Sequence, residues 1–289
     1  MSFFNPFNLR FGQADVDRAN VTIAAAETAS RSELHHAMVV RASCAPSGEL
    51  VPWFFRTCGW ALGGTPVITF MVYSAMRWPT ALRPIFFGQL GNQTHLAGCT
   101  FCNRGSCDDS SMANIARAYV AAIVSAVPIA FGAAVAAKRV SFLRPLARFA
   151  PYPGVAAANF VACMTIRHDD IAQGVPVSAG GLTIGHSQAA GWAAVRDTAL
   201  TRLVMPAGNF LIVPLVQWVL ERARGGLRPS LPVQVGVTAV IFSLWLPFSA
   251  SIFPPTGRLP IGDIEEDLRG KVPLDILGAT SYVEYQRGV

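Results

Sequence analysis

Long apolar stretches alternate along the chain with connections that carry most of the charge. A helix that crosses a lipid bilayer needs about 20 mostly apolar residues. Five stretches of that kind occur, at residues 53–76, 118–137, 149–166, 203–220 and 232–253. The third and fourth contain closely spaced prolines, which a membrane bundle tolerates, so we expect interrupted helices there. The pattern predicts an all-α, polytopic membrane domain over residues 53–256.

A sixth uncharged stretch, residues 84–103, differs from the others because polar side chains lie inside it. These are Gln89, Asn92, Gln93, Thr94 and His95. Polar groups are costly against lipid, so we expect a re-entrant or interfacial helix. The alternative is a sixth span whose polar side chains turn toward the bundle interior, which accepts such groups.

The two regions that flank the membrane domain are more polar. Within residues 1–52, charged positions interrupt residues 14–40, which predicts a helix on the membrane surface or a soluble docking helix. The first residues lack a basic segment followed by an apolar one, so we expect insertion to depend on internal apolar segments. Residues 257–289 are interpreted as a C-terminal tail.

The charge supports a membrane protein and argues against nucleic acid as a partner. Charged residues make up 14% of the chain, against roughly 25% in soluble domains. The net charge of +6 comes from arginines that flank apolar runs, not from a basic stripe that would suit nucleic acid. The most basic connections are residues 138–148 and 222–228. With five spans, both connections lie on the side of the N-terminus, which the positive-inside rule then assigns to the inner compartment.

Several short motifs occur in an order that resembles one family. They are NQT at residues 92–94 with Asn103 and Arg104 downstream, RFAPYPGVAAAN at 148–159, GVPV at 174–177, GHSQAA at 185–190 and PVQVG at 232–236. From about Pro46 onward, the chain resembles the sideroflexins. The resemblance implies a multi-pass protein of the mitochondrial inner membrane, surrounded by lipid, that carries small amino acids such as serine. Together with the charge bias, it places the N-terminus in the matrix.

The chain departs from the sideroflexin pattern before the first apolar stretch. There the family has an HPDTGE motif, of which Pro46, Gly48 and Glu49 remain, while the histidine and the aspartate are absent. The Asn-Ile-Pro segment that follows Asn159 in the family is also replaced, and the N-terminal region is short. Two functions therefore stay open: a carrier, or a transport-inactive structural subunit of a larger inner-membrane complex, such as a respiratory complex or ATP synthase.

A zwitterionic amino acid needs partners for its carboxylate and its ammonium group near the middle of the membrane. The candidates for substrate binding are Asn92, Gln93, Thr94, Asn159 and Arg167. The alternative for the amides is hydrogen bonding between helices. For Arg167 the alternative is a long side chain that reaches the interface from a helix end.

Cysteines and one histidine raise the question of a metal. His95, Cys99, Cys102 and Cys107 lie close together in the sequence. Their spacing matches no common zinc signature, so we expect no metal, and a disulfide or simple packing are the alternatives. The other cysteines, Cys44, Cys58 and Cys163, are isolated and indicate packing. No Ser-His-acid arrangement or Gly-rich phosphate loop occurs, so we expect neither an enzyme nor a cofactor.

Overall fold

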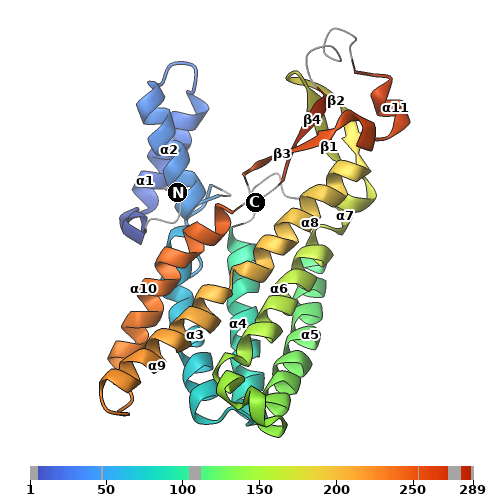
Figure 1. Cartoon of the computed structure of the whole chain (residues 1–289). Coiled ribbons are helices and arrows are strands. Elements are labelled where there is room, and N and C mark those ends of the chain that lie inside the picture. Colours follow the sequence, from blue (N-terminus) through green and yellow to red (C-terminus); the bar gives the residue numbers. More distant parts are fainter. Residues whose placement is uncertain (1–5, 47, 104–111, 253, 273–280, 288–289) are drawn as a thin grey trace.

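The computed structural model describes residues 6–46, 48–103, 112–252, 254–272 and 281–287. Its main body is a bundle of helices that run side by side, with a helical hairpin and a four-stranded sheet at one end (Figure 1). The bundle contains α3 (Trp60–Arg77), α4 (Leu82–Cys102), α5 (Met112–Arg139), α6 (Pro151–Ile166), α8 (Gln188–Val204), α9 (Val213–Ala223) and α10 (Leu231–Ala250). Shorter elements are η2 (Pro6–Arg10), η3 (Thr57–Gly59), η4 (Ser141–Phe149), α7 (His168–Ala172), η6 (Ile261–Asp263) and α11 (Glu266–Arg269).

Within the described residues, three helices are long and apolar enough to cross a membrane. They are α5, the continuous run Gln188–Ala223 that joins α8 to α9, and α10. The pair η4 and α6, bent by 58°, makes a fourth candidate if it counts as one span. The polytopic helical class is therefore confirmed, but the expected count of five spans is too high. The bend falls just before Pro151, where closely spaced prolines predicted an interruption.

The first predicted span, residues 53–76, is shortened because its first residues fold back over the start of α3. A Cβ atom on Gly59 would lie 2.1 Å from the carbonyl oxygen of Trp53. One on Gly63 would lie 2.2 Å from the carbonyl oxygen of Phe54. Only glycine permits such a close approach of two backbone segments. The helix itself starts at Trp60, and its 18 residues are not apolar enough to count among the candidate spans.

The sixth stretch, residues 84–103, forms α4, one continuous helix of 21 residues. It lies in the bundle between α3 and α5 (Figure 1). The side chains of Gln89, Asn92 and Gln93 are buried there. The polar side chains thus turn toward the interior, as in the alternative considered above, but α4 is not among the candidate membrane spans.

Small residues hold α5 and α6 close together. The buried positions of α5 include Ala118, Ala122, Ala126, Ala130, Ala134 and Ala137, which form a stripe along one face. Gly154 of α6 lies against this stripe, and a Cβ atom there would be 2.7 Å from the Ala126 oxygen. Helices in lipid associate mainly through such van der Waals contact between small residues. The pair therefore forms a close-packed wall of the bundle.

The run from α8 to α9 is interrupted by a π-helix, η5 (Gly208–Ile212). The Val213 N–H donates to the Gly208 oxygen five residues earlier, which is the π-helical pattern. Pro206 just upstream has no N–H to donate, so the regular α pattern is already broken there. Gly208 also lies against α10, because a Cβ atom on it would be 2.2 Å from Cγ of Trp245.

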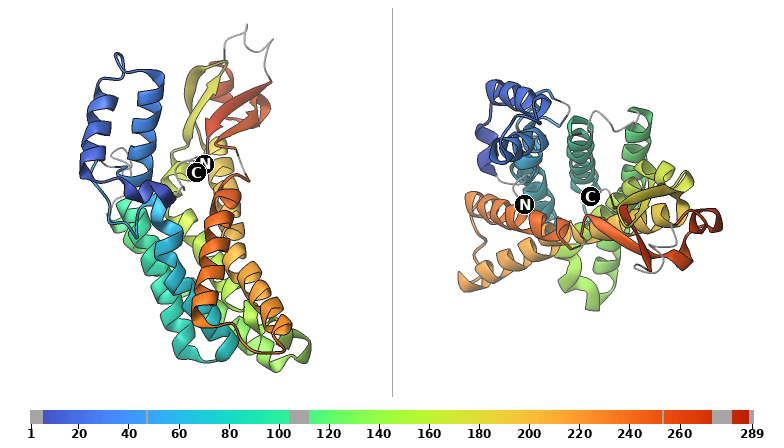
Figure 2. Two further views of the ribbon diagram at one scale, coloured as in Figure 1. Left: turned by 90° about the vertical axis from the view of Figure 1, so that its left-hand side faces the viewer. Right: turned by 90° about the horizontal axis from the view of Figure 1, so that it is seen from above.

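The N-terminal region forms two helices, α1 (Gln13–Ala24) and α2 (Arg31–Cys44), which pack as a hairpin beyond the end of the bundle (Figure 2). A capping box starts α2. The Glu33 N–H donates to Ser30 Oγ at 3.3 Å, and the Ser30 N–H donates to the Glu33 carboxylate at 3.0 Å. The single helix predicted over residues 14–40 is therefore wrong, because this local signal begins a second one.

The C-terminal tail is part of a sheet. β1 (Val175–Ala179), β2 (Leu182–Ser187), β3 (Thr256–Pro260) and β4 (Tyr282–Gln286) form an antiparallel sheet in the order β2-β1-β4-β3. One face packs on α8 and α11 through a small core that includes Val177, Ala194, Leu268, Val283 and Tyr285. The all-α prediction missed this sheet because its strands are short and Ser178 pairs with Glu284, 106 residues away.

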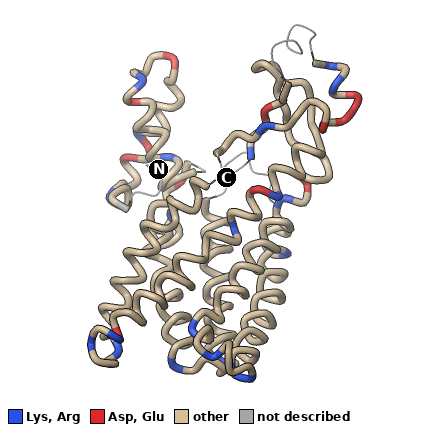
Figure 3. The backbone as a smooth tube through the Cα atoms, in the orientation of Figure 1, with Lys and Arg blue, Asp and Glu red and all other residues tan. Residues whose placement is uncertain are grey.

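Basic residues gather at the end of the bundle opposite the hairpin and the sheet (Figure 3). They are Arg77, Arg83, Lys138, Arg139, Arg144, Arg148, Arg222, Arg224 and Arg228, in or beside the connections α3–α4, α5–α6 and α9–α10. The expectation that the basic connections lie on the N-terminal side is wrong. The reason is that α4 also runs the length of the bundle, although it is not among the candidate spans, so the chain passes along the bundle once more before residue 138 than was expected.

Candidate functional site

Buried polar side chains inside the bundle form the candidate site. Three amides on one face of α4, those of Gln89, Asn92 and Gln93, are 1%, 7% and 3% exposed. Both polar atoms of Gln89, and the amide nitrogens of Asn92 and Gln93, have no hydrogen-bond partner among the described residues. A buried polar atom without a partner costs about 1–3 kcal/mol. The presence of several such unpaired atoms on one face of α4 is therefore not explained by the stability of the fold alone.

The Gln89 amide lies where four helices meet. A cavity of about 20 Å³ at this point is lined by side chains of α3, α4, α5 and α6, including Met71, Ser74, Gln89, Ala130 and Pro151. Gly154 of α6 packs directly against the amide, since a Cβ atom there would lie 3.0 Å from Gln89 Nε2. This space admits about one water-sized group. A ligand larger than water would therefore bind here only after the helices separate slightly.

A second pair of buried amides lies on the run from α8 to α9. Asn209 in the π-helix is 4% exposed and Gln217 in α9 is 1% exposed. Asn209 Oδ1 and both amide atoms of Gln217 lack a partner among the described residues. Val213 lies between them at a spacing of four residues, and it packs in an apolar cluster with Met71 of α3. Asn209 and Gln217 therefore lie on the same side of the run as Val213, the side that packs toward α3.

Thr69 of α3 adds a hydroxyl group to this set, which we call the interior amide cluster: Thr69, Gln89, Asn92, Gln93, Asn209 and Gln217. Thr69 is 4% exposed, and its Oγ1 has no partner in the described part of the chain. Amide nitrogens donate to a carboxylate, while amide and hydroxyl oxygens accept from an ammonium or a hydroxyl group. These side chains therefore offer donors and acceptors without any fixed charge, and Gln89 is the one of the six that lines the small cavity described above.

Arg202, near the end of α8, is a further cation of the bundle and lies near Cys163 and Arg167. Its side chain is partly buried, and its contact in the described residues is the Sδ atom of Met205, 3.9 Å from Nη1. No acidic side chain of the described residues forms an ion pair with it. An arginine at membrane depth without a carboxylate partner is a candidate functional residue, because placing its charge there costs free energy.

The residues predicted to bind substrate are not all brought together. Asn92 and Gln93 belong to the interior amide cluster. Thr94, in contrast, lies on the exposed side of α4, where its hydroxyl contacts Tyr119 Oη at 2.9 Å. Asn159 on α6 is half-buried, and its side chain makes no hydrogen bond within the described residues. A role for Asn159 in binding stays a prediction.

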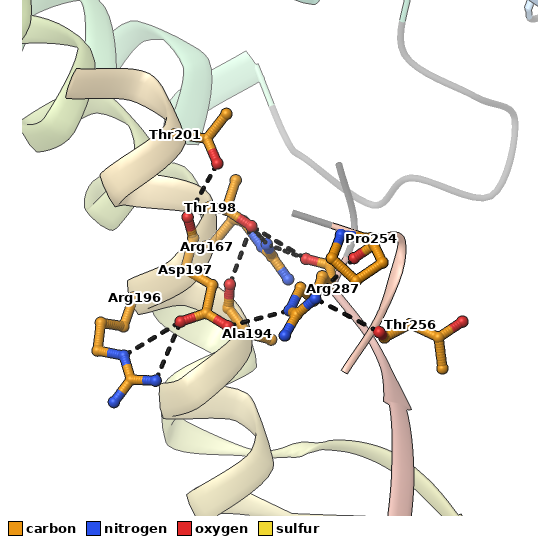
Figure 4. Close-up of polar contacts among 9 residues, drawn as sticks. All are labelled: Arg167, Ala194, Arg196, Asp197, Thr198, Thr201, Pro254, Thr256 and Arg287. Atoms are coloured by element: carbon orange, nitrogen blue, oxygen red, sulfur yellow. Dashed lines mark hydrogen bonds and ion pairs between the residues drawn. The ribbon is translucent and has the colours of Figure 1, made fainter. Parts of the chain in front are cut away.

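Arg167 occupies a junction between the bundle and the sheet instead (Figure 4). Its Nε donates to Asp170 Oδ2 at 2.7 Å, and its Nη1 donates to Thr198 Oγ1 at 2.8 Å. Nη1 also donates to the carbonyl oxygen of Arg287. These bonds join α6, α7, α8 and the residue after β4. The guanidinium is occupied by structural contacts, so it is not oriented toward the interior amide cluster.

The remnants of the eroded family motif surround Arg41 of α2. Arg41 donates to the carbonyl oxygens of Ala45 and Pro46 at 3.0 and 3.2 Å, and to Asn20 Oδ1 at 2.6 Å. Gly48 adopts a φ of +98°, which favours glycine, and its oxygen accepts from Asn20 Nδ2. Glu49 is exposed. This segment therefore ties the end of α2 to α1 and is distant from the interior amide cluster.

Asn103 and His95 hold the fold-back segment in place. Asn103 Nδ2 donates to the carbonyl oxygen of Phe55, and its Oδ1 accepts from Thr57 Oγ1 at 3.0 Å. His95 Nε2 lies 3.1 Å from the carbonyl oxygen of Phe54. Arg104, the other motif residue, lies outside the described residues. Asn103 and His95 thus have structural partners at the end of α4.

Of the weak metal candidates, two come together. Cys99 Sγ lies 3.7 Å from His95 Nε2, while Cys102 is half-buried and Cys107 lies outside the described residues. Among the described residues, no group of three or more His, Cys, Asp or Glu side chains is arranged to hold a metal ion.

Sequence reasoning did not single out Thr69, Asn209 or Gln217. A signal existed for the last two, because Asn209 and Gln217 are lone polar residues eight positions apart in an otherwise apolar run. That spacing puts both on one face of a helix. Which face looked inward was not evident from the run itself, since apolar residues cover all its other sides.

The fold and the site together define a multi-pass membrane protein with a helical bundle and a polar interior. The family model of the sideroflexins matches residues 2–289, so the chain belongs to the sideroflexin family. It is 30% identical to human sideroflexin-5 over 223 residues, which cover 74% of this chain and 64% of that protein. It is 29% identical to sheep (Ovis aries) sideroflexin-1 over 192 residues, covering 65% and 59% of the two chains.

A third relative is cattle (Bos taurus) sideroflexin-2, which is 26% identical over 231 residues, 78% of this chain and 70% of that protein. The match thus spans less than two thirds of human sideroflexin-5 and of sheep sideroflexin-1. No solved structure matches the chain.

Proposed function

We propose that this sideroflexin is a carrier of small, neutral amino acids such as serine in the mitochondrial inner membrane. The observation that carries the proposal is the interior amide cluster, with buried donors and acceptors that no described residue pairs with. A protein that only needed stability would gain by replacing such groups with apolar ones of the same size. Their presence is accounted for if a polar substrate supplies the missing partners during transport.

The chemistry of the cluster suits a zwitterion. The amide nitrogens of Gln89, Asn92 and Gln93 can donate to the substrate carboxylate, and the Asn209 oxygen can accept from its ammonium group. Thr69 adds a hydroxyl partner for a substrate hydroxyl. Arg202 supplies a positive charge on the path, and its long-range attraction favours an approaching carboxylate.

Movement of the α8–α9 run opens the way to the cluster in this proposal. The π-helix places Asn209 at a break in the helix, and broken helices at mid-membrane sites are where carriers bind substrate. Gly208 packs on Trp245 without an intervening side chain, so α9 can rotate against α10 about this contact. The cavity beside Gln89 would then widen from water size to substrate size.

We also propose an orientation. Basic loops are retained in the matrix during insertion, and here they lie at the end of the bundle away from the hairpin and the sheet. The N-terminal hairpin and the sheet then face the intermembrane space. This replaces the orientation expected from a five-span count.

Uptake of labelled serine into liposomes that contain the purified protein tests the carrier. We expect Gln89→Leu and Asn209→Leu each to lower the initial rate at least tenfold. Thermal unfolding should stay unchanged or shift to higher temperature, because each change removes an unpaired buried polar group worth about 1–3 kcal/mol. The control is Thr100→Val on the exposed face of α4, whose hydroxyl bonds only to its own helix at Leu96 O, 3.0 Å away.

The alternative is a structural subunit of a larger inner-membrane complex. The observation in its favour is the eroded family motif. What remains of it packs around Arg41, whose guanidinium is bonded to the backbone carbonyl oxygens of Ala45 and Pro46 beside the lost family residues. Absence of uptake for every small neutral amino acid, combined with migration of the native protein in a large complex on a blue-native gel, would reject the carrier and support this function.

A further inference from the structure

Two cysteines that are separate in the sequence meet where the N-terminal hairpin joins the bundle. Cys44 is the last residue of α2, and Cys58 lies in η3, just before α3. Their Sγ atoms are 3.7 Å apart. Both side chains are buried, with exposed fractions of 0% and 3%. The interpretation of Cys44 and Cys58 as isolated packing residues is therefore wrong, because the fold-back segment carries Cys58 to the end of α2.

The surroundings of the pair are polar on the Cys44 side. Cys44 Sγ lies 3.3 Å from the carbonyl oxygen of Asn8 and 3.5 Å from Ser43 Oγ. The nearby Arg56 guanidinium is 7% exposed and donates to the carbonyl oxygens of Val51 and Phe11 at 2.7 and 3.0 Å. Arg56 forms no ion pair with an acidic side chain of the described residues, so its charge remains available to stabilise an anion beside it.

This environment makes the two thiols unequal. The hydrogen bond from Cys58 lowers the pKa of the Cys44 thiol; burial raises it, but the hydrogen bond with Ser43 and the charge of Arg56 lower it further, and the result is a lowered pKa. The same hydrogen bond raises the pKa of the Cys58 thiol, and burial raises it as well. The thiolate is the reactive form of cysteine, so Cys44 is the nucleophile of the pair and Cys58 the partner that keeps its proton.

We propose that Cys44 and Cys58 are a redox-active dithiol, which hydrogen peroxide oxidises to a disulfide that fastens the N-terminal hairpin to the start of α3. In the first step the Cys44 thiolate attacks one peroxide oxygen, and the O–O bond breaks. The departing hydroxide takes up a proton and becomes water, while Cys44 becomes a sulfenic acid.

In the second step the sulfur of Cys58 attacks the sulfur of Cys44. The S–S bond forms as the S–O bond breaks, and the Cys58 proton leaves with the oxygen as a second water. Two thiols are thereby oxidised by two electrons and one peroxide is reduced to two waters. Peroxide is close to water in size, so a brief local opening of the hairpin suffices to admit it.

The disulfide has a structural consequence. It closes a loop between residues 14 positions apart, one in the hairpin and the other at the entry to the bundle. A bond of this kind restricts how far α2 can separate from α3. The oxidised and reduced forms therefore differ in how freely the hairpin moves at the end of the bundle.

The test uses the full-length protein in lipid nanodiscs, treated with hydrogen peroxide, alkylated with N-ethylmaleimide and mapped by mass spectrometry. We expect a Cys44–Cys58 cross-linked peptide, two hydrogens lighter than the free pair, that dithiothreitol abolishes. In Cys58→Ser, dimedone should label Cys44 as a trapped sulfenic acid, with at least fivefold more label than in the wild type. Cys163→Ser is the matched control, and it should behave like the wild type.

Two outcomes would overturn the proposal. One is full alkylation of Cys44 and Cys58 after a peroxide treatment that oxidises other cysteines of the chain. The other is a cross-link in which either residue is joined mainly to a different cysteine. Because the mapping is done first on the wild-type chain, a variant that fails to fold does not prevent the decision.

Discussion

Arg287 Nε lies 3.0 Å from Oδ2 of Asp197 and joins the end of β4 to the middle of α8. Both side chains are largely buried, with exposed fractions of 13% and 8%. The guanidinium also donates to the carbonyl oxygen of Pro254 at 2.8 Å, and the Arg287 oxygen accepts from Thr198 Oγ1 at 3.1 Å (Figure 4). One residue after the last strand therefore holds the sheet against the bundle.

The first prediction concerns this contact. Arg287→Ala leaves Asp197 buried with only the exposed Arg196 as an ionic partner, and breaking a buried pair in this way costs about 3–5 kcal/mol. We expect a clear loss of thermal stability in detergent and earlier proteolysis of the C-terminal segment. The matched control is Arg258→Ala, which removes an exposed pair with Glu284 on the same sheet and should cost less than about 1 kcal/mol. Equal effects of the two variants would contradict the argument.

The second prediction concerns the contact between the π-helix and α10. In Gly208→Ala, the new methyl group would lie 2.2 Å from Cγ of Trp245, so the ring or the helix must move. Overpacking of this kind costs about 1–3 kcal/mol, and we expect a lower unfolding temperature. Gly236→Ala in α10 is the control, because a Cβ atom there meets nothing within 4 Å. It should be neutral or stabilise by up to about 1 kcal/mol.

The third prediction concerns pH. Glu265 Oε1 accepts from the N–H groups of Gln188 and Ala189 at 2.7 and 3.0 Å and so caps the start of α8. Burial raises the pKa of Glu265, but these hydrogen bonds lower it, and the result is a pKa below the ordinary value of 4.5. The carboxylate therefore contributes stability above pH 4.5, and this contribution is lost as the pH falls through the lowered pKa.

Glu265→Gln should lower stability by about 1 kcal/mol at pH 7, because it removes a charge from a helix N-terminus. As the pH falls below 4.5, the difference between variant and wild type should shrink. Thermal unfolding at pH 7 and at pH 3 measures both. The neighbouring Glu266→Gln is the control, since Glu266 is exposed and does not cap the helix. A gap that persists at pH 3 would refute the capping role.

The fourth prediction concerns orientation. Leu227 is 73% exposed in the basic connection before α10, and Gly262 lies at the opposite end beside the sheet. In mitochondria stripped of their outer membrane, a membrane-impermeant maleimide should label Gly262→Cys above the wild-type background. Leu227→Cys should be labelled only after the inner membrane is permeabilised. The reverse pattern would show that the basic end faces the intermembrane space.

The amino-acid sequence alone determined the class of this protein. Apolar runs of membrane length are unfavourable in water, so the apolar parts of α5, α9 and α10 were predicted, although the α8–α9 run begins at Gln188 and not at residue 203. The prolines at the start of α6 marked a real bend. The ordered motifs likewise led to the sideroflexin family, which the family model confirms. Local sequence patterns were sufficient to predict these features, because each depends on one stretch of the chain and on whether water or lipid surrounds it.

Only the tertiary structure decided the rest, because it depends on which distant residues become neighbours. Glycines at 59 and 63 let a fold-back segment shorten α3, and that segment brought Cys58 to Cys44. The sheet forms through pairing of distant residues, such as Ser178 with Glu284. The amides of α4 are buried because α3 and α5 pack against this helix. Hydrophobicity along the chain determines which segments form membrane helices. The pairing of the strands, the burial of the amides and the end of the bundle at which each connection lies depend on packing between segments that are distant in the sequence.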